Sequence, residues 1–118
     1  MTHDALVRFA AGKLKIPLRE WNGRQVYSKT IARESGWIVL DDGKYKTFDI
    51  TSPELFLKGL EVLPDYISWD IDGDKSERYV NLVDLRKGDT NAARFCKTPK
   101  EIPLLFWQCY YELEGGQP

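Results

Sequence analysis

The densest group of residues that could do chemistry is a run of carboxylates at alternate positions, Asp70, Asp72 and Asp74. Alternate carboxylates can surround a hard cation, and the run resembles the start of a calcium-binding loop. Such a loop needs glycine at its sixth position and a bidentate glutamate at its twelfth, where this chain has Lys75 and Asn81. We therefore interpret the run as the tip of a β-hairpin with tight Asp-Gly turn geometry, and we expect no metal there.

Residues for the common catalytic constellations are scarce. The single histidine, His3, lies at the N-terminus, and the two cysteines, Cys96 and Cys109, are far from it in sequence. Histidine-based triads and zinc sites need more such residues, and the chain contains neither a P-loop nor a G-x-G-x-x-G motif. We expect a protein that binds rather than catalyses and that uses no cofactor. A small enzyme that relies on carboxylates or a divalent metal remains an alternative.

Charge is segregated along the chain, although the net charge is −1 at pH 7. Residues 1–33 carry seven Lys/Arg against two Asp/Glu, whereas residues 34–85 carry five against twelve. In space, these blocks could form one basic and one acidic surface, or they could interleave and cancel.

The elements that must position these residues are indicated by three glycine-centred turn signals. They are Asn22-Gly23, Asp42-Gly43 and Asp72-Gly73-Asp74. Such sequences supply the positive φ of tight hairpin turns, and the flanking residues are rich in strand formers. They predict hairpins that pair 18–21 with 24–31, 37–41 with 44–50, and 66–71 with 78–85. Residues 86–98 predict a loop followed by either a helical turn or a short strand.

Apolar periodicity predicts helices over 4–15 and from the Thr51-Ser52-Pro53 cap to Pro64. For 99–113 we favour a third helix, although the aromatic run there would also suit a strand. The prediction is one α+β domain over 1–118, with 114–118 as a flexible tail. An antiparallel sheet of about five to six strands would carry two to three helices on one face.

The tryptophans are expected to divide between core and surface. Trp37, Trp69 and Trp107 should lie largely in the core, because their large apolar area is normally buried. Trp21 adjoins a turn and should be accessible. Two free thiols, no secretory signal and no apolar run of membrane-spanning length predict a cytoplasmic protein.

The first functional hypothesis is a protein-binding module that acts stoichiometrically, such as an inhibitor or immunity-type protein. Its acidic hairpins would dock on the basic site of a nucleic-acid-handling protein. The residues proposed for this contact are Asp42, Tyr66, Trp69, Asp70, Asp72 and Asp74.

The alternative from another class is single-stranded nucleic-acid binding by the basic N-terminal third. Arg19, Arg24 and Lys29 would contact phosphates while Trp21 stacks on a base. The slightly acidic net charge weighs against a dedicated DNA-binding domain, which usually carries a basic excess throughout.

Overall fold

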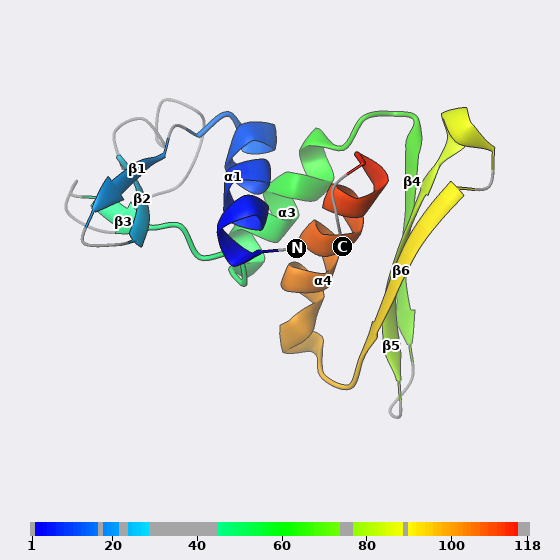
Figure 1. Cartoon of the computed structure of the whole chain (residues 1–118). Helices are drawn as coiled ribbons and strands as arrows, with labels where there is room; N and C mark the ends of the chain where they lie inside the picture. The colour runs from blue at the N-terminus through cyan, green and yellow to red at the C-terminus, as the bar shows by residue number, and fades with distance from the viewer. Residues whose placement is uncertain are drawn as a thin grey trace.

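The computed structural model describes residues 2–16, 18–21, 24–28, 45–73, 77–88 and 90–115. Its helices are α1 (His3–Leu14), α3 (Pro53–Val62) and α4 (Ile102–Leu113), with short 3-10 turns η1 (Leu85–Lys87) and η2 (Pro99–Glu101). Its strands are β1 (Arg19–Trp21), β2 (Arg24–Ser28), β3 (Tyr45–Thr47), β4 (Ile67–Gly73), β5 (Arg78–Asp84) and β6 (Thr90–Cys96) (Figure 1).

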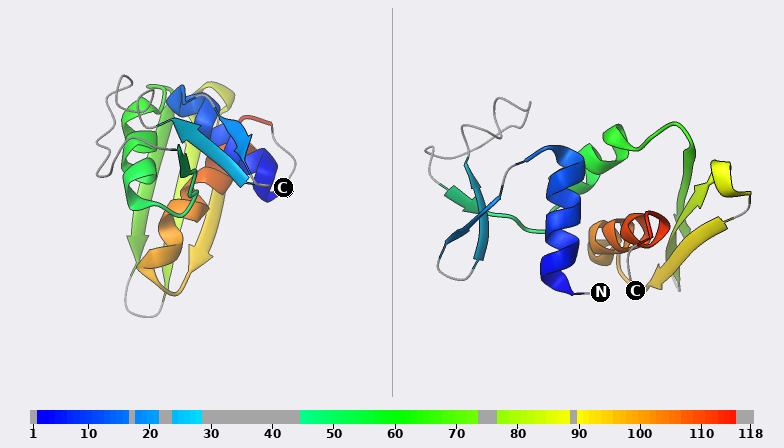
Figure 2. Two further views of the ribbon diagram at one scale, coloured as in Figure 1. Left: turned by 90° about the vertical axis from the view of Figure 1, so that its left-hand side faces the viewer. Right: turned by 45° about the horizontal axis from the view of Figure 1, so that its top comes forward.

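The described strands form two sheets, so the predicted single sheet of five to six strands is wrong, although the α+β class is confirmed. One antiparallel sheet has the order β1-β2-β3 and the other β4-β5-β6. The helices lie between them (Figures 1 and 2). The division begins after Thr47, where Phe48 and Ile50 leave the strand and become buried, each only 2% exposed. These two side chains join the helical core instead of prolonging β3.

Two of the three predicted hairpin turns are tested by the register. β1 pairs with β2 so that Trp21 faces Arg24, which leaves a two-residue connection at Asn22-Gly23. β4 pairs with β5 from Gly73↔Arg78 to Ile67↔Asp84. Asp72 and Gly73 therefore belong to β4, and the prediction that they form the tight turn is wrong. The predicted strand 37–41 and its Asp42-Gly43 turn lie outside the described residues, and β3 pairs with β2.

Local capping explains where the helices begin. The side chain of Thr2 accepts a hydrogen bond from the Ala5 amide at 3.1 Å, and that of Ser52 accepts one from Leu55 at 3.4 Å. The predicted helix over 99–113 is confirmed as η2 followed by α4. Pro103 is tolerated because it lies in the first turn of α4, where its missing N–H has no partner within the helix.

The core is built around α4. Phe106, Trp107 and Tyr110 are fully buried. Gly59 of α3 allows close packing of the two helices, since a Cβ at this position would lie 2.6 Å from the Phe106 ring and 2.8 Å from the Trp107 ring. Phe9 of α1 meets the Tyr110 ring edge-on at 5.1 Å.

On its other side, α4 covers the inner face of β5 and β6. Val80 and Leu82 of β5 are completely buried there, and the Cys109 thiol contacts the Val80 carbonyl at 3.7 Å. Trp69 is paired with Leu82 and therefore shares this face, but it lies on the edge strand β4, whereas α4 packs chiefly on β5 and β6. Trp69 is thus 50% exposed, which corrects the prediction that it lies in the core.

Substitution Gly59→Ala should lower the free energy of unfolding by about 1–3 kcal/mol, because the added methyl group overlaps the rings of Phe106 and Trp107. Urea denaturation followed by tryptophan fluorescence measures the change. Gly12→Ala in α1 is the matched control: its Cβ meets no atom within 4 Å, so higher helix propensity should raise stability by up to about 1 kcal/mol. Equal effects of the two substitutions would contradict this packing.

Candidate functional site

Two residues of the site proposed from the sequence, Asp70 and Asp72, lie on the face of the β4–β6 sheet that points away from the helices (Figure 1). Strand alternation and register place one set of side chains there: Ser68, Asp70, Asp72, Tyr79, Asn81, Val83, Asn91, Ala93 and Phe95. We call this set the outer face. All its members are exposed or half-buried, and no described helix or strand lies over them.

Four residues of the outer face form a contiguous acidic–aromatic cluster: Asp70, Asp72, Tyr79 and Phe95. The register aligns Asp72, Tyr79 and Phe95 in one row across the three strands. The Tyr79 hydroxyl donates a hydrogen bond to Asp70 Oδ2 at 2.9 Å, and its ring lies 6.1 Å from that of Phe95 at 53°. Phe95 is 63% exposed. The cluster therefore presents an accessible aromatic ring beside carboxylates.

The electrostatics of the cluster are dominated by these carboxylates. The hydrogen bond to Asp70 raises the pKa of Tyr79, and desolvation and the negative charges of Asp70 and Asp72 raise it further. The outer face contains no lysine or arginine. Towards its other end, Asn91 donates a hydrogen bond to the Asn81 side chain at 3.0 Å and adds no charge. The formal charges on the outer face are therefore those of Asp70 and Asp72, both in the cluster.

Two residues predicted for the same site lie elsewhere. Trp69 is on the inner face, opposite to Asp70. Tyr66 precedes β4, and its ring is covered by the Arg86 guanidinium, whose central carbon lies 3.5 Å from the ring centroid. Arg86 is held in turn by buried Asp84, with an N–O distance of 3.1 Å. Tyr66 therefore supports the end of the sheet, and the structure separates both aromatics from the carboxylates.

The cluster contains two residues that sequence reasoning missed, Tyr79 and Phe95. Tyr79 was predicted on a strand but had no identified neighbour. Phe95 lies in β6, a segment for which the sequence left a helical turn or a short strand open. Residue types in β6 did not show that Phe95 faces outward, because the inward set of Ala92 and Cys96 also contains Arg94.

The residues for the nucleic-acid alternative are only partly described. Arg19 and Trp21 lie in β1, and Arg24 lies in β2 directly opposite Trp21. Three residues lie outside the described part of the chain: Lys29, and Asp42 and Asp74 of the acidic proposal.

Other chemistry in the described residues is limited. They contain no group of three or more His, Cys, Asp or Glu that could hold a metal ion. Cys96 and Cys109 are free and buried, and desolvation raises the pKa of Cys109 to about 11, so this thiol stays protonated at neutral pH. Within the same residues, no helix has the length and apolar character needed to cross a membrane.

The Tyr79 phenol should titrate above its ordinary value of about 10, and Asp70→Asn should lower its pKa towards that value. Asp72→Asn should have a smaller effect in the same direction, because Asp72 acts only through its charge. NMR titration of the tyrosine ring carbon measures each value. Asp65→Asn removes the same charge outside the outer face and should change the Tyr79 pKa least; an equal shift in this control would contradict the assigned contact.

Comparison with known proteins gives no functional assignment, so the functional interpretation is based on the geometry of the chain. No protein-family model, curated protein or solved structure matches this chain. The feature that bears most directly on function is therefore the uncovered outer face, with its exposed phenylalanine beside paired tyrosine and aspartate side chains.

Proposed function

We propose that this chain is a stoichiometric protein-binding module that docks on a basic partner through the outer face of the β4–β6 sheet. The observation that carries the proposal is the acidic–aromatic cluster, in which exposed Phe95 packs beside Tyr79 and next to Asp70 and Asp72. Aromatic side chains dominate the energy of many interfaces, and complementary charge around them speeds association.

The rigidity of the cluster supports this function. Its side chains project from three hydrogen-bonded strands, and Tyr79 is fixed by the hydrogen bond to Asp70 and the ring contact with Phe95. A surface that is ordered before binding loses little conformational entropy when a partner docks. A sheet backed by α4 therefore provides a preorganised platform.

The charge of the cluster favours a partner with a basic site. Proteins that handle nucleic acids concentrate Lys and Arg where they contact phosphates. The carboxylates of Asp70 and Asp72 would meet such a site with complementary charge, whereas they would repel a nucleic acid directly. An inhibitor or immunity-type protein that occupies a nucleic-acid-binding site fits this arrangement.

Substitution Phe95→Ala should weaken partner binding by about 2 kcal/mol, or roughly thirtyfold in Kd, because it removes the exposed aromatic anchor. The double substitution Asp70→Lys and Asp72→Lys should slow association by about tenfold or more at low salt. The immobilised chain is used to capture proteins from lysate of the source cells, with and without nuclease treatment. Binding of each captured protein is then measured by surface plasmon resonance.

The matched control is Leu57→Ala, which removes another exposed apolar side chain on α3, away from the outer face. This variant should bind the partner as the unmodified chain does. Retained binding by Phe95→Ala, or capture that disappears only with nuclease treatment, would contradict the proposal. Direct binding to a labelled single-stranded oligonucleotide would instead favour the basic N-terminal third.

A further inference from the structure

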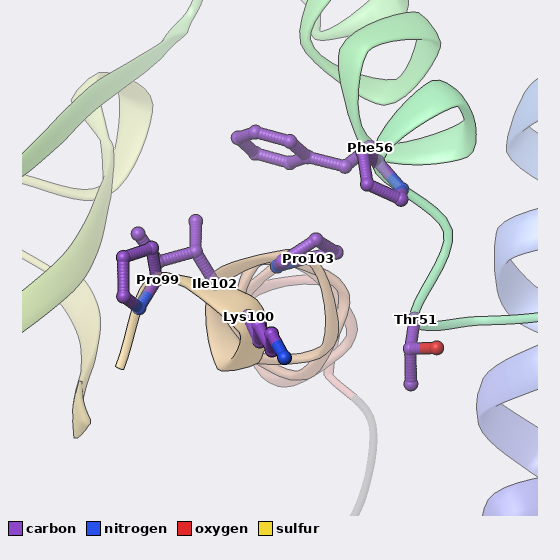
Figure 3. A pocket seen from close by; sticks show the side chains of 7 residues that line it. Thr51, Phe56, Pro99, Lys100, Ile102 and Pro103 are labelled. Atoms are coloured by element: carbon purple, nitrogen blue, oxygen red, sulfur yellow. The ribbon is translucent and has the colours of Figure 1, made fainter. Parts of the chain in front are cut away.

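A pocket of about 410 Å³ opens between the N-terminal ends of α3 and α4, away from the outer face. Its lining consists of Thr51, Pro53, Phe56, Pro99, Lys100, Ile102 and Pro103. Figure 3 shows Phe56 projecting from α3 above Pro103 and Ile102, with Lys100 and Thr51 in the lower part of the view. The volume lies within the range of small-molecule sites, which is about 300–1,000 Å³.

The apolar part of the pocket is formed by rigid groups. The Phe56 ring packs edge-on against buried Phe106, with ring centroids 5.2 Å apart. Pro53, Pro99 and Pro103 contribute rings that have little freedom to rearrange. The pocket is therefore largely formed before a ligand enters, which reduces the entropy lost on binding.

The polar part of the pocket contains one cation, Lys100, which forms no ion pair with a described residue. The adjacent carboxylate, Glu101, is engaged by the capping box and accepts hydrogen bonds from the Thr98 amide at 3.2 Å and hydroxyl at 3.1 Å. These bonds lower the pKa of Glu101 and hold it at the turn. No carboxylate is among the lining residues, and the Asp49 carboxylate beside the pocket accepts the hydrogen bond of the Thr51 hydroxyl.

We propose that this pocket binds a small apolar carboxylic acid. The hydrocarbon or aromatic body lies against Phe56 and Pro103, and the carboxylate pairs with the ammonium group of Lys100. This ligand class and location are separate from the protein-docking function of the outer face, so the two proposals can fail independently.

The backbone around the pocket has few N–H donors and is therefore poorly suited to bind a phosphate group beside Lys100. Phosphate sites at helix N-termini depend on several free backbone N–H donors. Pro53, Pro99 and Pro103 have no N–H, and the hydroxyl of Thr51 already donates to Asp49 at 2.6 Å. One flexible ammonium group beside an apolar lining suits a singly charged, largely apolar anion.

The test is a titration of the 15N-labelled full chain with 4-phenylbutyrate, 4-phenylbutanol and 4-phenylbutylamine, followed by amide chemical shifts. The carboxylate should bind saturably with Kd of about 1 mM and perturb amides at Thr51, Lys100 and Ile102. The amine should bind about fivefold more weakly, because it places a like charge beside Lys100.

Two lysine variants separate the local contact from net charge. Lys100→Gln should weaken 4-phenylbutyrate binding about threefold, whereas Lys97→Gln, an exposed lysine outside the lining, should leave it unchanged. The proposal is overturned by no saturable binding up to about 20 mM, well above the expected constant. Equal affinity for the acid and the amine, unchanged acid binding by Lys100→Gln, or shifts confined to the outer face would also overturn it.

Discussion

The burial of α4 on several sides is the constraint on which the rest of the structure depends. Its aromatic side chains pack against α1 and α3, while Cys109 packs against the β5 backbone. A helix that is apolar around most of its circumference cannot remain at a surface, since the hydrophobic effect favours its enclosure between layers. The sheet β4–β6 supplies one layer and the other two helices supply the opposite one. This arrangement uses the inner face of the sheet and leaves the outer face available.

The helices were the most predictable part of the chain. A hydroxyl cap followed by proline marks the start of α3, and Pro64 limits its C-terminal end. These signals act within a few residues, so they can be read without knowledge of the tertiary structure. The pairing of Trp21 with Arg24 is local in the same sense. The number of strands in each sheet depends instead on distant contacts, such as the burial of Phe48 and Ile50 among the helices.

The candidate site was predicted in part. Asp70 and Asp72 were predicted together for one partner contact and do lie on one face of β4, whereas Trp69 was predicted to lie largely in the core. α4 packs chiefly on β5 and β6, so Trp69 on the edge strand stays half exposed, whereas Ile67 of the same strand is buried. Phe95 could not be recognised as a neighbour of Tyr79 until β6 was paired with β5. Proximity across strands depends on register, which the composition of one segment does not determine.

The buried thiols have a practical consequence. Cys109 of α4 contacts the β5 backbone, and Cys96 is buried at the end of β6; desolvation raises the pKa of both. Alkylating reagents attack the accessible thiolate, so the folded chain should resist them until α4 and the sheet separate. The rate of modification at Cys109 therefore reports how often α4 separates from the β4–β6 sheet. A cysteine introduced on the surface can carry a fluorescent label while the two native ones remain protected.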